Sequence, residues 1–182
     1  MSRSRQKYRK PSERAAGFIL SIFDWIKDIV GSPSNVIPRG HVIKHQGREL
    51  DPGRTLRYKA ILLVEDDPAT AGNFIGAIRK HYTCGSIMIY VAHAFDAAVN
   101  FFDNEDVDLV IMDADLDDED GDGAELVRKF NTRRPELPIL ANSSSRISNR
   151  KLTGYGAVKI LGKDPRKLED WLIQHDPAEA RN

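Results

Sequence analysis

Apolar segments and segments of helical periodicity alternate along the chain from residue 60 onward. Five apolar runs have the length of buried strands, and they span residues 60–64, 86–93, 107–113, 138–143 and 157–163. Helical spacing of apolar positions follows four of these runs, over residues 68–82, 94–105, 123–133 and 165–175. The weakly amphipathic stretch 145–156, between the last two runs, predicts a fifth and shorter helix.

This alternation predicts an α/β domain. Parallel strands need crossover connections, so five strands alternating with five helices indicate a doubly wound, five-stranded parallel sheet with helices on both faces. The expected strand order is 2-1-3-4-5, as in flavodoxin-like folds. In such sheets the ligand binds outside the carboxyl ends of the strands, so functional residues are expected where each apolar run ends.

Polar residues stand at that end of four predicted strands. Glu65 and Asp66 follow the first strand, Asp113 the third and Ser143 the fourth, while Lys163 ends the fifth. The first and third strands are neighbours in the expected order, so the three carboxylates converge and repel one another unless a cation neutralises them. Hard oxygen ligands that leave room for water and phosphate oxygens favour Mg²⁺. A lysine and a serine hydroxyl nearby suit a phosphoryl group on one of the acids, which is the chemistry of an aspartyl phosphate.

The same segments resemble the receiver (CheY-like) domain of bacterial two-component response regulators. The resemblance covers residues 59–176 and is carried, in order, by ILLVEDDP, DLVIMDADLDDEDG, LPILANSS and GAVKILGKDP. It implies a phosphorelay protein that is not an enzyme and lies in the cytoplasm. It also implies that a histidine kinase or a phosphotransfer protein supplies the phosphoryl group.

The resemblance gives a role to each acidic residue of the site. It implies that Asp113 is the phosphoacceptor. It implies that Mg²⁺ is held by Glu65, Asp66, Asp113 and the backbone carbonyl of Asp115. The site would then carry out Mg²⁺-dependent phosphorylation and signal through protein–protein interaction.

Two further site residues match the family pattern, and two other positions depart from it. Ser143 stands where the family has a hydroxyl that moves onto the phosphate, and Lys163 where it has a lysine that pairs with the phosphate. Asp117 replaces the usual proline four residues past the acceptor, and Ile160 replaces the usual aromatic residue three positions before the lysine. We therefore expect an intact phosphate site, with a relay to the output surface that differs from the usual one.

An acidic loop follows the predicted phosphoacceptor. Seven carboxylates lie between Asp113 and Asp122, and the first half of a calcium-binding loop is matched from Asp118. The twelfth position of that loop is Lys129 instead of Glu, which excludes an EF-hand. We expect a solvated loop that strengthens divalent binding or meets a basic partner, with Gly121 as the family's turn glycine.

Residues 1–58 form a basic N-terminal extension. They carry 12 Lys and Arg against 5 Asp and Glu, whereas residues 59–182 carry 15 against 22, so the net charges are +7 and −7. A basic arm of this kind is typical of a flexible, solvated tail. The sharper alternative is contact with nucleic acid or an anionic membrane surface, which would make the protein a DNA- or membrane-associated regulator.

An amphipathic helix is predicted within this extension, over residues 12–30. Its apolar arc is too wide to stay in water, and the residues expected to dock it are Phe18, Ile22, Trp25, Ile26 and Ile29. The surface it meets is left open: the receiver-like domain, a second copy in a homodimer, an effector protein or a membrane. Residues 32–58 predict a turn-rich linker with one short hairpin at most, and residues 177–182 a C-terminal tail.

Composition narrows the class of protein without choosing among the remaining functions. With 41% apolar and 30% charged residues, the chain has the balance of a soluble globular protein. Its single cysteine, Cys84, excludes an internal disulfide and favours a reducing compartment. Two rivals to signalling stay open: a receiver-like binding scaffold that is not phosphorylated, and a Mg²⁺-dependent phosphohydrolase with an aspartyl nucleophile.

Overall fold

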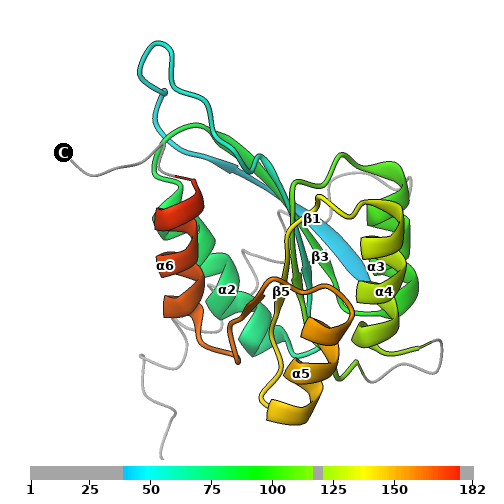
Figure 1. Ribbon diagram of the computed structural model, residues 1–182. Helices are drawn as coiled ribbons and strands as arrows, with labels where there is room; N and C mark the ends of the chain where they lie inside the picture. The colour runs from blue at the N-terminus through cyan, green and yellow to red at the C-terminus, as the bar shows by residue number, and fades with distance from the viewer. Residues whose placement is uncertain (1–38, 117–120, 177–182) are drawn as a thin grey trace, which may run out of the picture. The chain divides into compact units, whose positions relative to one another are not determined.

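The computed structural model describes residues 39–116 and 121–176 (Figure 1). These residues belong to one compact unit that spans Ile37–Asn182. The predicted helix 12–30 with its docking residues, the basic arm, residues 117–120 of the acidic loop and the tail 177–182 lie outside the described residues. In the part that is described, no helix combines the length and the apolar character needed to cross a membrane.

Six strands and five helices make up the described unit. The strands are β1 (Gly40–Gln46), β2 (Ala60–Val64), β3 (Ser86–Ala92), β4 (Leu109–Met112), β5 (Ile139–Ala141) and β6 (Lys159–Ile160). The helices are α2 (Pro68–His81), α3 (Phe95–Asn104), α4 (Gly123–Arg133), α5 (Arg146–Gly154) and α6 (Pro165–His175). The weakly amphipathic stretch therefore does form a helix, α5.

The strands form one sheet in the order β1-β3-β2-β4-β5-β6. The five strands from β2 to β6 pair in parallel, in the predicted flavodoxin-like order 2-1-3-4-5. Each of the three central strands β2, β4 and β5 is an almost continuously buried apolar run. Burial on both faces is what a parallel sheet covered by helices on each side requires.

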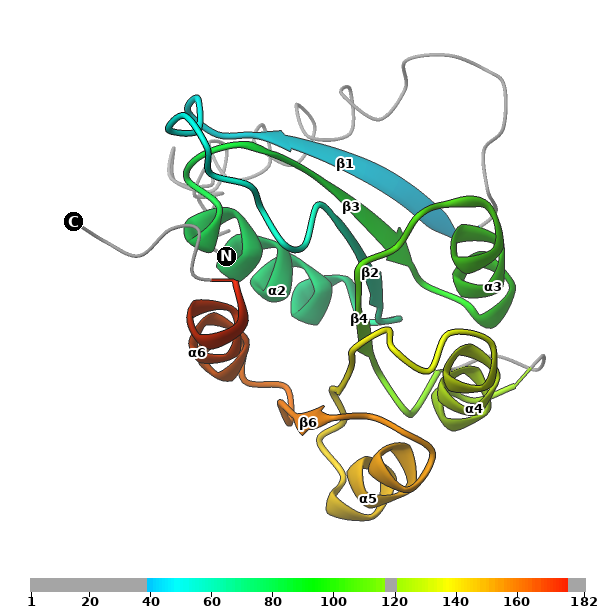
Figure 2. The ribbon, with the colours of Figure 1, turned by 45° about the horizontal axis from the view of Figure 1, so that its top comes forward.

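The sixth strand, β1, corrects the prediction for residues 40–46, which we assigned to a turn-rich linker. It pairs antiparallel with β3 over seven residues, from Gly40 opposite Ala92 to Gln46 opposite Ser86. Its side chains alternate between partly buried and exposed positions, as expected of an edge strand covered on one face only. The extra strand covers the edge of β3 that a five-stranded sheet would leave open (Figure 2).

Helices cover both faces of the sheet (Figure 2). On one face, α2 and α6 pack against the sheet through a core that includes Phe74, Ile78, Leu168 and Trp171. On the other face, α3, α4 and α5 close a second core, in which the rings of Phe102 and Phe130 are stacked 3.9 Å apart. Because β2 to β6 are parallel, their carboxyl ends all lie at one rim of the sheet.

The segment between β1 and β2 is tied to the domain by a buried acid, Asp176, which directly follows α6. Its carboxylate accepts hydrogen bonds from the backbone amides of Arg57 and Tyr58, each at 3.1 Å. It also accepts one from the Tyr82 hydroxyl at 2.9 Å. Because an acid that is 1% exposed must have its lone pairs satisfied, these contacts fix the entry into β2.

Candidate functional site

The carboxylates predicted from the sequence converge at the carboxyl ends of β2 and β4. Val64 and Met112 are paired residues of these neighbouring strands, and the chain continues from them into Glu65 and Asp113. The Asp113 amide donates to the Val64 carbonyl at 2.9 Å, which extends the sheet hydrogen bonding by one residue. The sheet itself therefore places Asp113 beside the acidic pair that follows β2.

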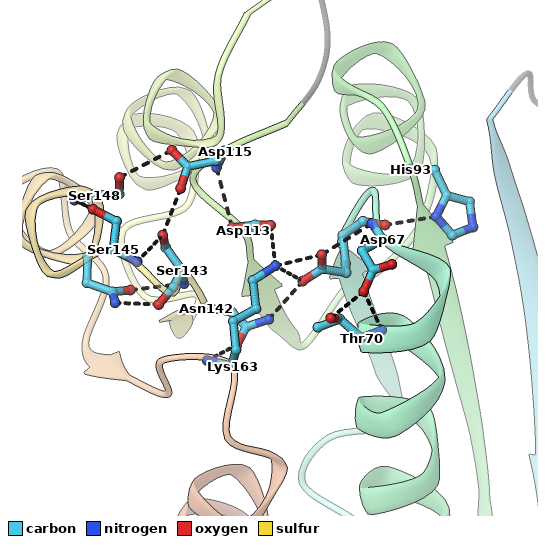
Figure 3. Close-up of polar contacts among 12 residues, drawn as sticks. Asp67, Thr70, His93, Asp113, Asp115, Asn142, Ser143, Ser145, Ser148 and Lys163 are labelled. Atoms are coloured by element: carbon cyan, nitrogen blue, oxygen red, sulfur yellow. Dashed lines mark hydrogen bonds and ion pairs between the residues drawn. The ribbon is translucent and has the colours of Figure 1, made fainter.

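Lys163 reaches these acids from the loop after β6 (Figure 3). Its Nζ atom lies 2.5 Å from Asp113 Oδ2 and 2.7 and 2.6 Å from the two carboxylate oxygens of Glu65. The backbone of Lys163 is left-handed, with φ of 60°, and it follows Gly162 with φ of 66°. This unusual turn for a non-glycine residue aims the side chain back over the ends of the strands.

Burial sets the electrostatics of the site, because Glu65 is 0% exposed and Asp113 only 2%. Burial raises the pKa of the Glu65 carboxyl group from 4.5 to about 7; hydrogen bonds from Lys163 oppose this rise, and the charge of Asp113 adds to it. Burial alone would lower the pKa of Lys163, but its hydrogen bonds to Asp113 and Glu65 outweigh that effect and raise it. The lysine therefore stays charged, and the site is short of positive charge when Glu65 ionises.

The donor set fits a divalent cation. Glu65, Asp66 and Asp113 each offer a carboxylate oxygen, and these oxygens lie within 4.8 Å of one another. With all three acids ionised, they and Lys163 carry a net formal charge of −2, which one divalent ion balances. A hard cation with oxygen ligands, such as Mg²⁺, suits this set, and its charge would favour the ionised form of Glu65.

Asn142, the residue between β5 and Ser143, is part of the site and was not predicted. It is fully buried; its Nδ2 atom donates to Glu65 Oε2 at 3.1 Å and its Oδ1 atom accepts from the Lys163 amide at 2.9 Å. Asn142 thus connects a predicted metal ligand with the backbone that carries the predicted phosphate lysine. A polar residue at the end of the apolar run ILA was the available sequence signal.

Ser143 lies at the same rim, where its hydroxyl contacts Asp115. Its Oγ atom donates to Asp115 Oδ2 at 2.8 Å, and Ser148 Oγ donates to the other oxygen, Oδ1, at 3.2 Å. Ser145 caps α5, since its Oγ atom accepts from the Ser148 amide at 3.2 Å. Figure 3 shows this group of hydroxyls around Asp115, two residues past Asp113. The resemblance gave a role to the backbone carbonyl of Asp115 alone, and the contacts of its side chain with the two serines were not predicted.

Two more contacts were missed at the rim. His93 Nδ1 lies 2.8 Å from the backbone oxygen of Glu65, so the residue that follows β3 helps to fix the loop that carries the predicted metal ligands Glu65 and Asp66. The structure also places Gly123, the first residue of α4, against Asp113: a Cβ atom there would overlap the Asp113 backbone oxygen. Gly121, which we expected as the turn glycine, has a positive φ of 148°, and a Cβ atom there would meet the Phe95 ring.

The fold and this rim define a class: doubly wound α/β domains with an acidic, lysine-bridged cluster at the ends of the central strands. The sequence of residues 61–171 matches the model of the response regulator receiver domain. Because the match covers more than half of the chain, the protein belongs to the family of response regulator receiver domains. No curated protein matches it.

Solved receiver structures share the fold. A CheY-like receiver domain protein from Methanospirillum hungatei JF-1 is 22% identical, with a TM-score of 0.53, and covers 68% of this chain and 98% of its own. The receiver domain of NtrX from Brucella abortus is 20% identical, with a TM-score of 0.54, and covers 67% and 99%. The DrrB receiver domain, in a structure described as BeF3-activated, is 21% identical, with a TM-score of 0.51, and covers 67% and 97%.

Proposed function

We propose that this chain is a phosphorelay response regulator in which Asp113 accepts a phosphoryl group in a Mg²⁺-dependent manner. The donor is a histidine kinase or a phosphotransfer protein, the setting is the cytoplasm, and the protein is an acceptor and not an enzyme. The observation that carries the proposal is the Asp113 carboxylate: it is 2% exposed, bonded to Lys163 Nζ at 2.5 Å, and clustered with Glu65 and Asp66. The family and the BeF3-activated DrrB receiver support it.

The transfer needs only groups that the site and the donor contain. A carboxylate oxygen of Asp113 attacks the phosphorus of a phosphohistidine, the new O–P bond forms, and the P–N bond breaks with its electron pair going to the imidazole. The imidazole then takes up a proton from solvent. The ammonium group of Lys163, already beside Asp113, compensates negative charge that the phosphoryl oxygens bring.

Four donors of this chain would hold Mg²⁺: the carboxylates of Glu65, Asp66 and Asp113 and the backbone carbonyl of Asp115. When bound, the ion supplies positive charge next to the phosphoryl oxygens. The burial of Asp113 and Glu65 keeps bulk water from the acceptor, which slows hydrolysis of the acyl phosphate.

We propose that output is by protein–protein interaction, with a second copy or an effector protein. Apolar side chains at the α5–β6 side support this, since Ile147 is 81% exposed, Val158 63% and Ile160 39%. Ile160 occupies the position where the family usually has an aromatic residue. An aliphatic side chain there has no ring whose rotation could respond to phosphorylation. Coupling between Asp113 and the α5–β6 surface must therefore use other residues.

The test is phosphorylation by a small phosphodonor, such as acetyl phosphate, followed by intact mass. Wild type should gain one phosphoryl group with Mg²⁺ and none with EDTA, and Asp113→Ala should gain none. Asp106→Asn is the matched control, because Asp106 is an exposed acid outside the site, and it should behave as wild type. A wild-type protein that stays unmodified would favour the scaffold; turnover of a phosphomonoester would favour a phosphohydrolase.

A further inference from the structure

We infer that the side chain of Asp115 restrains Ser143 in the unphosphorylated protein and competes with the phosphoryl group for the Ser143 hydroxyl proton. The inference rests on the proposed function, because it concerns the same site. Asp115 is thus a positioning residue through its carboxylate, in addition to the role proposed for its backbone carbonyl.

The Asp115 carboxylate holds two hydroxyls at once. Ser143 Oγ donates to Oδ2 at 2.8 Å and Ser148 Oγ donates to Oδ1 at 3.2 Å. Ser143 belongs to the loop after β5, and Ser148 to the first turn of α5. Both carboxylate oxygens are therefore used to tie the start of α5 to the loop that follows Asp113 (Figure 3).

The backbone of Ser143 is fixed separately by Asn149. The amide of Ser143 donates to Asn149 Oδ1 at 3.1 Å, and Asn149 Nδ2 donates to the Ser143 carbonyl at 2.7 Å. Asn149 is itself 5% exposed, so these two bonds are shielded from water. With the backbone held on both sides, rotation about the side-chain torsion is the motion left to the Ser143 hydroxyl.

A serine hydroxyl has one proton to donate. In this structure that proton goes to Asp115, so it is not available to a phosphoryl oxygen on Asp113. Ser143 Oγ also accepts from the Ser145 amide at 3.0 Å, and Ser145 is the N-cap of α5. Turning the hydroxyl toward a phosphoryl group therefore costs the bond to Asp115 and removes the acceptor of the Ser145 amide.

This arrangement gives phosphorylation a route to the protein surface. Ile147, the most exposed of the large apolar side chains described, lies in the first turn of α5 between the two residues that the restraint involves, Ser145 and Ser148. Releasing Ser143 from Asp115 loosens that turn and changes how Ile147 is presented. This route does not need the aromatic side chain that the family usually has at the position of Ile160.

The negative charge of Asp115 could by itself weaken binding of a phosphoryl group, because any acid near Asp113 repels one. This is a rival explanation for an effect of Asp115 on phosphoryl binding. Two substitutions separate the explanations. Asp115→Asn removes the charge but keeps an oxygen that accepts from Ser143, whereas Asp115→Ala removes both. The backbone carbonyl, the proposed metal ligand, is present in both variants.

The first measurement is the affinity of the folded full-length protein for beryllofluoride in saturating Mg²⁺. Asp115→Ala should bind about fivefold more tightly than Asp115→Asn, the factor that corresponds to one hydrogen bond of average net strength. In a Ser143→Ala background the difference between the two variants should vanish. Equal affinities of Asp115→Ala and Asp115→Asn in protein that keeps Ser143 would overturn the inference, whereas failure of wild type to bind beryllofluoride at all would overturn the proposed function.

The second measurement needs neither metal nor phosphate. In metal-free protein, amide hydrogen exchange at Ser145 should be faster in Asp115→Ala than in wild type, because the released Ser143 hydroxyl no longer holds that amide. Asp115→Asn should stay close to wild type. Exchange that is unchanged in Asp115→Ala would show that Asp115 does not restrain Ser143.

Discussion

In protein freed of divalent ions, Glu65 should make the stability of the fold depend on pH. The Glu65 carboxyl group is 0% exposed, and its pKa is raised to about 7 from 4.5, chiefly by burial. The folded state therefore holds this proton more tightly than the unfolded chain. The stabilisation is fully present below about pH 4.5 and is lost as the pH rises through about 7.

The size of the effect follows from the two pKa values. The difference between 4.5 and about 7 corresponds to roughly 3 kcal/mol of unfolding free energy, since one pH unit is worth about 1.4 kcal/mol. Glu65→Gln is the matched variant, because the amide keeps the shape and an acceptor for Lys163 but does not titrate. Between about pH 4.5 and pH 8, the unfolding free energy of the wild-type protein should therefore fall by roughly 3 kcal/mol relative to that of Glu65→Gln.

The assay is urea unfolding of both proteins in EDTA across this pH range. The quantity to compare is the unfolding free energy of wild type minus that of Glu65→Gln at each pH, because the other titrating groups are common to both proteins. Saturating Mg²⁺ should recover most of the loss at the alkaline end, since the ion binds the ionised carboxylate. If the two proteins show parallel pH profiles in EDTA, the reasoning from burial of Glu65 is refuted.

Two further predictions concern the support of the site. Asn142→Leu leaves the partly buried Lys163 amide without its side-chain acceptor and should lower the unfolding free energy by about 2 kcal/mol; urea unfolding equal to wild type would contradict it. Gly123→Ala places a methyl group against the Asp113 carbonyl and should lower the melting temperature or prevent folding, whereas Gly72→Ala, on an open face of α2, should stabilise by up to about 1 kcal/mol. Thermal melts of the two alanine variants decide this, and equal melting temperatures would count against the close approach.

The sequence was sufficient for the central part of the fold. Strands buried on both faces are continuous apolar runs, so β2, β4 and β5 stand out, and helices at regular intervals imply parallel order. The edge strand β1 did not stand out. Only one of its faces is covered, and it contains His41, Lys44 and His45. Its partner β3 is also remote in sequence: the paired residues range from Gln46 opposite Ser86 to Gly40 opposite Ala92, beyond the reach of local patterns.

The residues of the site that lie at the ends of strands could be predicted from the sequence. Glu65, Asp66, Asp113 and Lys163 meet because the sheet order brings their strands together, and that order follows from the hydrophobic pattern. The side-chain contact between Asp115 and Ser143 was not predictable, because it depends on how a loop and a helix start pack in three dimensions. The close approach of Gly123 to the Asp113 carbonyl was not predictable for the same reason, since spacing along the chain does not show which residues of the loop and helix start touch.

The central claim is that Asp113 itself becomes an acyl phosphate, and borohydride reduction tests it most directly. After treatment with a phosphodonor and Mg²⁺, borohydride converts a phosphorylated aspartate into homoserine, which peptide mass spectrometry locates in the sequence. We predict homoserine at position 113 and at no other acid of the rim. Homoserine at Asp115 or Asp66, or a peptide with unmodified Asp113 in protein that carries phosphate, would contradict it.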